Sequence, residues 1–191
     1  MLGTPCTSWS LARRGPPSSP WGPLRSALHV LGLPGLPPQG QARVECGNRT
    51  MRHTAAAVRM AIRHGVPAML ENPNTSRLFK APDISRLSRS ASFCRRVLDQ
   101  CQYNTPWRKR TTLWGWNTGH EPAGLDVRCQ GRQSRCSRTA RLHVILKGNG
   151  PHGKLWTSIA QAYPKPLADK IADLLVTSFE NIRIGAGLLR V

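Results

Sequence analysis

Two short segments carry side chains suited to covalent chemistry on an aromatic ring. Cys6 lies in the segment TPCTSWS (4–10), and Glu71 follows the apolar run VPAML (66–70). A thiolate that adds to carbon 6 of cytosine pushes electron density onto carbon 5, which is otherwise a poor nucleophile. A carboxylic acid eases that attack by protonating ring nitrogen 3. Cys6 and Glu71 therefore predict covalent catalysis on a cytosine that has left the base stack.

This chemistry requires both side chains to share one pocket. Residues 66–70 are apolar and few, which indicates a buried parallel strand. A Cys and a Glu that follow neighbouring parallel strands converge in the crevice where such sheets bind ligands. The sequence therefore predicts that Cys6 and Glu71 face each other at one edge of the sheet. The simpler alternatives are an exposed, untuned thiol at Cys6 and an ion-paired carboxylate at Glu71.

A third candidate segment is basic and rich in tryptophan. Its tryptophans, Trp107, Trp114 and Trp116, could stack nucleic-acid bases, although tryptophans at strand spacing are more often core residues. Its basic run could contact phosphates or form an ordinary solvated face. We expect DNA contact from this run, which consists of Arg108, Lys109 and Arg110.

Three cysteines and a histidine supply the ligand types of a tetrahedral zinc site. They lack the tight Cys-x-x-Cys pair that makes a zinc prediction strong. We therefore expect ordinary reduced cysteines and no bound metal, with zinc as the alternative. The chain shows no secretory signal, so its six cysteines do not predict a disulfide framework. The four candidate ligands are Cys101, Cys129, Cys136 and His143.

The charge balance favours a polyanionic partner. The 191 residues include 28 Lys and Arg against 9 Asp and Glu, for a formal charge of +19. Such an excess attracts nucleic acid in a salt-dependent way, so double-stranded DNA is the expected partner. The alternative is a basic organellar or poorly folded chain. No apolar run approaches the ~20 residues of a membrane-spanning helix, and the nucleus or nucleoid is favoured over an organelle.

Hydrophobic periodicity predicts the elements that position these residues. Residues 11–43 are rich in Pro, Gly, Ser and Arg and predict a disordered loop. Thr54 can cap a helix that ends at Gly65, directly before the strand at 66–70. A second helix is expected from Ser85, with its apolar side extending to Leu98. Further strands are expected at 111–116 and 141–146.

A final helix is expected to begin at Pro164 or Pro166. Its apolar stripe recurs at helical spacing and consists of Leu167, Ile171, Leu174 and Leu175. Alternating helices and short buried strands predict an α/β layer architecture. The chain is long enough to form one domain with a hydrophobic core.

Four segments resemble, in the same order, motifs of the DNA (cytosine-5) methyltransferases. PC (5–6) resembles the nucleophile loop of that family, and ENP (71–73) resembles its Glu-Asn-Val motif with Pro in place of Val. QYNTPWRKR (102–110) resembles its Tyr-Gly-x-Pro-Gln-x-Arg-x-Arg segment, and QAYP (161–164) resembles its late Gly-Asn-x-x-Pro segment. Four matches in order and at compatible spacing favour this family.

The resemblance implies a role for each matching residue. Cys6 would be the nucleophile and Glu71 the acid at nitrogen 3. Arg108 and Arg110 would hold the flipped base and its phosphates. S-adenosylmethionine would be the methyl donor. Two residues would wall the cofactor side of the pocket, Gln161 and Tyr163.

The resemblance also implies a partial Rossmann-like methyltransferase fold, truncated at its N-terminus. Residues 1–116 would be part of the catalytic domain, 117–155 a small target-recognition insert, and 156–191 a segment and helix that return to the catalytic domain. In this family the donor-binding loop and the strand before the nucleophile lie upstream, where only five residues precede Cys6. We therefore expect the isolated chain to be inactive in methyl transfer. The alternatives are a noncatalytic nucleic-acid-binding protein that retains part of this scaffold, and a non-functional translated fragment.

Overall fold

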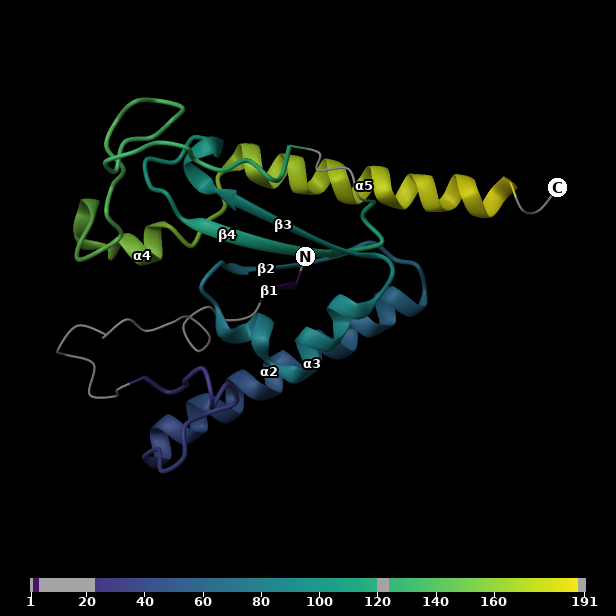
Figure 1. The fold of residues 1–191 in the computed structure, drawn as a ribbon, viewed down its shortest axis with the longest axis horizontal. Coiled ribbons are helices and arrows are strands. Elements are labelled where there is room, and N and C mark those ends of the chain that lie inside the picture. Colours follow the sequence, from purple (N-terminus) through teal and green to yellow (C-terminus); the bar gives the residue numbers. More distant parts are fainter. Residues whose placement is uncertain (1, 4–22, 120–123, 189–191) are drawn as a thin grey trace. The chain divides into compact units, whose positions relative to one another are not determined.

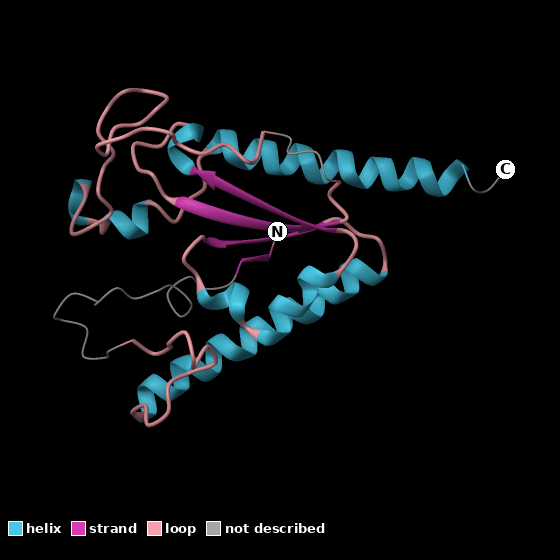
Figure 2. Cartoon of the chain, viewed as in Figure 1, coloured by secondary structure: helices cyan, strands magenta, loops and turns pink. Residues whose placement is uncertain are grey.

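A computed structural model describes residues 2–3, 23–119 and 124–188 (Figure 1). Helices and strands alternate along the chain (Figure 2), which confirms the predicted mixed α/β class. The elements in order are β1 (Leu2–Gly3), α2 (Pro38–Arg63), β2 (Ala68–Pro73), η1 (Arg77–Lys80), α3 (Pro82–Ser85), η2 (Arg86–Arg89), β3 (Phe93–Asp99), η3 (Gln100–Tyr103), β4 (Arg110–Trp116), η4 (Pro151–Gly153), α4 (Trp156–Ile159) and α5 (Lys165–Leu188).

The four strands form one sheet in the order β1-β2-β4-β3. β1 runs parallel to β2, with Leu2 opposite Leu70 and Gly3 opposite Glu71. The expectation that no strand precedes Cys6 is therefore wrong, because β1 pairs with β2 directly ahead of it. Cys6 itself lies outside the described residues.

β3 and β4 are antiparallel neighbours. The backbone N–H of Gln100 donates to the carbonyl of Lys109 at one end of the pair, and the N–H of Asn117 donates to the carbonyl of Ser92 at the other. β4 therefore lies between β2 and β3 although it follows both in sequence. The strand predicted at 111–116 is confirmed as β4.

The chain divides into two compact units. Unit 1 comprises Met1–Cys94 and Leu113–Gly119, and unit 2 comprises Arg95–Thr112 and His120–Val191. β3 and β4 each contribute residues to both units, and each unit has its own buried side chains.

Helix α2 of unit 1 begins much earlier than expected. Pro38 occupies its first turn, where a fixed φ favours helix and a missing N–H is tolerated. Thr54 is not a cap, since it lies inside the helix and its hydroxyl donates to the carbonyl of Thr50. Residues 38–43, assigned from sequence to a disordered loop, form the first turns of α2. The loop before them is pinned by the buried Arg25, whose guanidinium donates to the carbonyl of Val30.

The core of unit 1 lies between α2, the turns after β2, and β4. Trp114 packs against Phe79 and Phe93, with ring centroids 4.8 and 5.0 Å apart. Trp116 is fully buried, and its indole N–H donates to the carbonyl of Leu87. These two tryptophans are core residues and not a stacking surface for bases. The buried cluster consists of Met51, Ala55, Val58, Leu70, Leu78, Ala81, Ile84, Leu87, Trp114 and Trp116.

Two predicted elements are wrong. The helix expected from Ser85 ends within η2, and residues 93–99 form β3 instead. The extended chain buries Val97 and Leu98 while its backbone bonds to β4, so tertiary pairing overrides the helical spacing. No strand forms at 141–146 in the described chain. That segment makes only a single bridge, between Arg135 and Leu142.

Unit 2 contains the confirmed final helix. α5 begins at Lys165, and its apolar stripe is buried at Leu167, Ile171 and Leu174 and half-buried at Leu175. α5 contacts η3, the turn that follows β3. Among the described residues, neither α5 nor any other helix combines the length and hydrophobicity needed to cross a bilayer.

Candidate functional site

Glu71 is buried near the carboxyl end of β2. Only 4 % of its surface is exposed, and the neighbouring Asn72 is fully buried. The Asn72 amide donates to the carbonyl of Glu71 at 2.8 Å. The backbone then turns, since the N–H of Ser76 donates to the carbonyl of Pro73. Gly3, the last residue of β1, lies opposite Glu71 in the sheet.

Asp99 organises the predicted DNA-binding arginines. Its carboxylate is fully buried and accepts a two-pronged contact from Arg110, with Nε–Oδ1 and Nη2–Oδ2 distances of 2.9 Å. Arg108 donates from Nε to Oδ2 at 3.2 Å, and the backbone N–H of Cys129 donates to the same oxygen at 2.9 Å. Burial alone raises the pKa of Asp99, but hydrogen bonds from Arg110, Cys129 and Arg108 leave that pKa below its ordinary value.

The structure thus brings Arg108 and Arg110 together and gives both an internal partner. Their side chains are 37 % and 39 % exposed, and a guanidinium carries five N–H donors. Donors beyond those that Asp99 engages therefore remain for an external anion. The sequence interpretation missed Asp99, although it follows Val97-Leu98 as Glu71 follows Met69-Leu70. The signal was the same: a carboxylate directly after a buried apolar pair.

The third basic residue and the predicted cofactor residues lie on neighbouring segments. Lys109 donates from Nζ to the carbonyl of Ala160 at 3.0 Å. The next residue, Gln161, is exposed, and Tyr163 is half-buried. The contact between Lys109 and Ala160 links the basic run to the segment that carries both predicted cofactor residues.

A cavity of about 590 Å³ opens beside the basic run. Two of its lining residues, Arg108 and Lys109, come from the segment before β4, and His143 comes from the long loop of unit 2. Neither Gln161 nor Tyr163 lines it. The remaining lining residues are Gly131, Gln133, Ser134, Leu142, Val144, Ile145 and Leu146.

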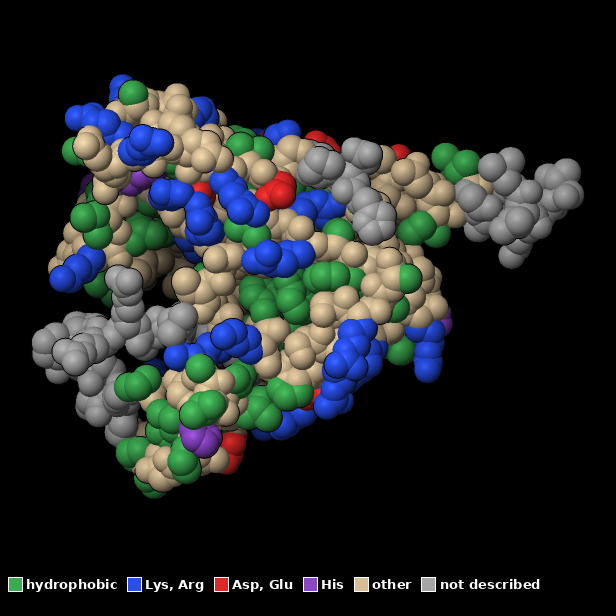
Figure 3. All heavy atoms as spheres, in the orientation of Figure 1, with side chains coloured by type: hydrophobic (Ala, Val, Ile, Leu, Met, Phe, Trp, Pro, Cys, Tyr) green, Lys and Arg blue, Asp and Glu red, His purple; other side chains and the backbone are tan. Residues whose placement is uncertain are grey.

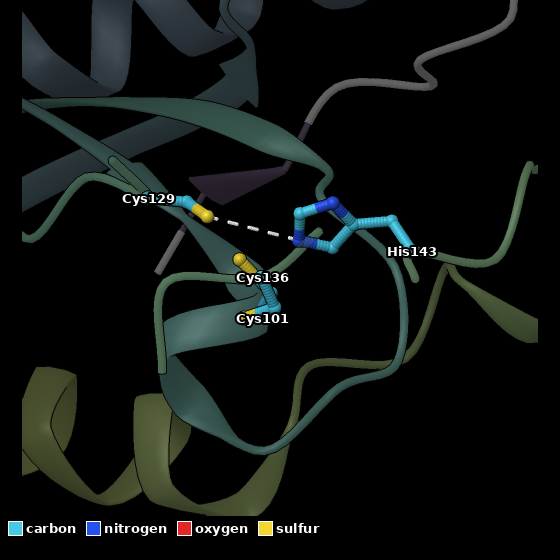
Figure 4. A group of neighbouring side chains, drawn as sticks. All are labelled: Cys101, Cys129, Cys136 and His143. Carbon is cyan, nitrogen blue, oxygen red and sulfur yellow. Dashed lines mark hydrogen bonds between the residues drawn. The ribbon is translucent and has the colours of Figure 1, made fainter. Parts of the chain in front are cut away.

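Three thiols and one imidazole meet at the base of this loop. Cys101 comes from η3, and Cys129, Cys136 and His143 come from the irregular segment after β4 (Figure 4). Their ligand atoms all lie within 4.8 Å of one another, and all three cysteines are buried and reduced. The cysteines are reduced, as expected from the sequence, and the structure gathers them with His143 into a single cluster.

Hydrogen-bond donors surround the sulfur atoms. The Ser137 amide and hydroxyl lie 3.3 and 3.5 Å from the sulfur of Cys129. Burial opposes ionisation, yet these donors and the Gly131 amide lower the pKa of Cys129 to about 6. Burial raises the pKa of Cys101 to about 12. For Cys136, the amides of Arg138 and Thr139 outweigh burial and lower the pKa. The surroundings of Cys129 and Cys136 thus favour negative charge on sulfur, whereas those of Cys101 oppose it.

Comparison with protein families, curated proteins and solved structures finds no match to this chain. The residues and their geometry are therefore the basis for a functional proposal. The structure brings together Arg108 with Arg110, and it gathers the four candidate zinc ligands. It describes Glu71 and the strand before Cys6, but Cys6 lies outside the described residues.

Proposed function

We propose that this chain carries the catalytic edge of a DNA (cytosine-5) methyltransferase-like domain. The observation that carries the proposal is the parallel register that sets Gly3 opposite Glu71. Cys6 follows Gly3 by three residues, which span at most about 11 Å of extended chain. In the proposal, these three residues would carry the Cys6 thiol to the edge where Glu71 is buried, as covalent chemistry on one base requires.

The proposed reaction begins with the addition of Cys6 to the cytosine ring. The Cys6 thiolate forms a bond to carbon 6 of cytosine while Glu71 donates a proton to nitrogen 3, leaving carbon 5 electron-rich. S-adenosylmethionine would supply the methyl group from its sulfonium. Loss of the carbon 5 proton to a base then expels the thiolate, and nitrogen 3 returns its proton to Glu71.

We further propose that this sheet is part of a Rossmann-like fold. In a doubly wound sheet the strands of the second half follow one another in space as they do in sequence. β1, β2 and β3 have that order, with the antiparallel β4 inserted between β2 and β3. In this proposal, the remaining donors of Arg108 and Arg110 contact the base and its phosphates, with Lys109 beside them. Gln161 and Tyr163 stay assigned to the cofactor side.

Exchange of the hydrogen at cytosine carbon 5 tests the proposal without a methyl donor. Thiolate addition lets carbon 5 take a solvent proton, so DNA containing tritium at that position releases it to water. We expect release by the wild-type chain, none above background with Cys6→Ser, and about 100-fold less with Glu71→Gln. Cys46→Ser is the matched control, since Cys46 is an exposed thiol on α2. Equal release by wild type and Cys6→Ser contradicts the proposal.

The second candidate function is noncatalytic binding of nucleic acid. The observation that favours it is a loop with seven basic side chains and no acidic one between residues 128 and 154. Lys and Arg also predominate over acidic side chains across the visible face of the molecule (Figure 3). This candidate predicts salt-dependent DNA binding that Cys6→Ser and Glu71→Gln leave unchanged, with no tritium release. The seven exposed residues are Arg128, Arg132, Arg135, Arg138, Arg141, Lys147 and Lys154.

A further inference from the structure

The geometry points to a structural Zn²⁺ site formed by Cys101, Cys129, Cys136 and His143. In a tetrahedral site with bonds of about 2.3 Å to sulfur and 2.05 Å to nitrogen, ligand atoms lie about 3.6–3.8 Å apart. The Cys129 sulfur lies 3.7 Å from the Nε2 atom of His143, and all four ligand atoms lie within 4.8 Å of one another. Closing the rest to tetrahedral distances requires movements of about 1 Å or less.

The spacing of the ligands along the chain also fits a site in which all four zinc ligands are protein side chains, three of them from one loop. Cys129, Cys136 and His143 recur at intervals of seven residues, while Cys101 comes from the turn after β3. Three protein thiolates and an imidazole leave no position for water or substrate, which is the arrangement of a structural and not a catalytic zinc. The missing Cys-x-x-Cys pair is thus compensated by folding, since η3 delivers the fourth ligand.

The surroundings of the sulfurs match those of metal-bound thiolates. The Gly131 amide donates to the sulfur of Cys129 two residues earlier, and the Arg138 amide donates to that of Cys136 in the same relation. The side-chain amide of Gln102 reaches the sulfurs of Cys101 and Cys136. Such outer contacts orient ligands and stabilise charge on them.

The segment 124–155 buries too few side chains to fix its own conformation, so it requires a cross-link. Among the described residues 124–155, only Leu125, Cys129 and Cys136 are buried, so two of the three buried side chains are proposed ligands. The segment has no strand or helix before η4. A segment that buries so little apolar surface gains its fixed shape from a metal or another cross-link.

The expected role follows from what the metal would join. Cys101 belongs to η3, which packs on α5, so the ion would anchor the loop to the rest of unit 2. The loop carries exposed arginines at 132, 135, 138 and 141, between and beside the ligands. Bound zinc would therefore fix the positions of these exposed arginines relative to one another. The inference concerns the metal alone and does not depend on catalysis by Cys6.

Metal content and Co²⁺ substitution test the inference on the full chain. We expect one zinc per chain by mass spectrometry. After chelation and reconstitution with Co²⁺, we expect the visible absorption of a tetrahedral ion and a near-ultraviolet charge-transfer band from three thiolates. Cys136→Ser should weaken metal binding by more than about 100-fold, and Ser137→Ala by about 10-fold. Cys46 and His152 are exposed residues outside the cluster. The control variants Cys46→Ser and His152→Asn should therefore change neither the metal content nor the affinity for the metal.

A rescue variant separates loss of the site from loss of the fold. His143→Cys keeps four ligands and should retain one Co²⁺ per chain, with charge-transfer intensity raised by about one third. Hydrogen exchange of residues 128–146 should speed up on chelation of the wild type. The inference is overturned if the folded wild type binds no Co²⁺ with tetrahedral absorption, or if chelation leaves exchange in this loop unchanged.

Discussion

Replacing Asp99 by Asn tests whether this one buried carboxylate positions the residues of unit 2 that bond to it. Asp99 accepts two contacts from Arg110, one from Arg108 and one from the Cys129 amide. Breaking a buried ion pair costs about 3–5 kcal/mol, but both arginines are partly exposed and regain hydrogen bonds to water. Asn keeps one carbonyl oxygen that can accept from the Cys129 amide or from an arginine, but its NH2 group faces the remaining donors, and an unmet buried donor costs about 1–3 kcal/mol. We expect a net loss of about 3 kcal/mol in the free energy of unfolding.

Urea unfolding, followed by circular dichroism and tryptophan fluorescence, measures this loss. The matched control is Asp169→Asn, because Asp169 forms an exposed ion pair with Lys165 on α5. That pair should contribute less than about 0.5 kcal/mol. If both variants lower the free energy of unfolding equally, Asp99 does not organise this region.

Three further perturbations follow from the packing and charge. Leu70→Ala removes a fully buried side chain of β2 and should lower the free energy of unfolding by about 2–5 kcal/mol in urea titrations, whereas the exposed Val66→Ala should have little effect. Trp116→Phe leaves the carbonyl of Leu87 without its indole donor and should cost about 1–3 kcal/mol by the same assay; an unchanged midpoint would count against that hydrogen bond. Combined replacement of Arg132, Arg135 and Arg138 by Gln should lower the salt slope of DNA binding by about 0.9 for each phosphate that the loop no longer neutralises, and an unaltered slope would exclude the loop as the DNA-binding surface.

Local patterns predicted the fold where sequence neighbours determine it. The run VPAML (66–70) predicted a buried strand, and β2 (Ala68–Pro73) overlaps its last three residues. The stripe beginning at Leu167 predicted α5. Residues 93–99 defeated the same reasoning, because their apolar side chains fit a helical period while their backbone pairs with β4, a distant segment. The early start of α2 was missed because the composition of residues 11–43 predicted a loop, although Pro38 is tolerated in the first turn of a helix.

The candidate sites depended on contacts that sequence spacing does not encode. Glu71 could be selected because its position after an apolar run is a local feature. The four candidate ligands could be named from their residue types, but their convergence could not be predicted, since Cys101 is separated from Cys129 by β4 and reaches it only through the fold. Asp99 could have been selected from the sequence, because it directly follows an apolar pair as Glu71 does. The roles of Gln161 and Tyr163 remain predictions, as do S-adenosylmethionine and DNA.

The most direct test of the central claim is the location of a covalent bond to the base. Duplex DNA with 2-pyrimidinone in place of cytosine lacks the electron-donating amino group, so its carbon 6 accepts a thiolate more readily. After incubation with the full chain, peptide mass spectrometry should find the modified nucleotide on the peptide that contains Cys6, and Glu71→Gln should reduce its yield. An adduct on another cysteine, or the same yield from Cys6→Ser, would contradict the proposed nucleophile.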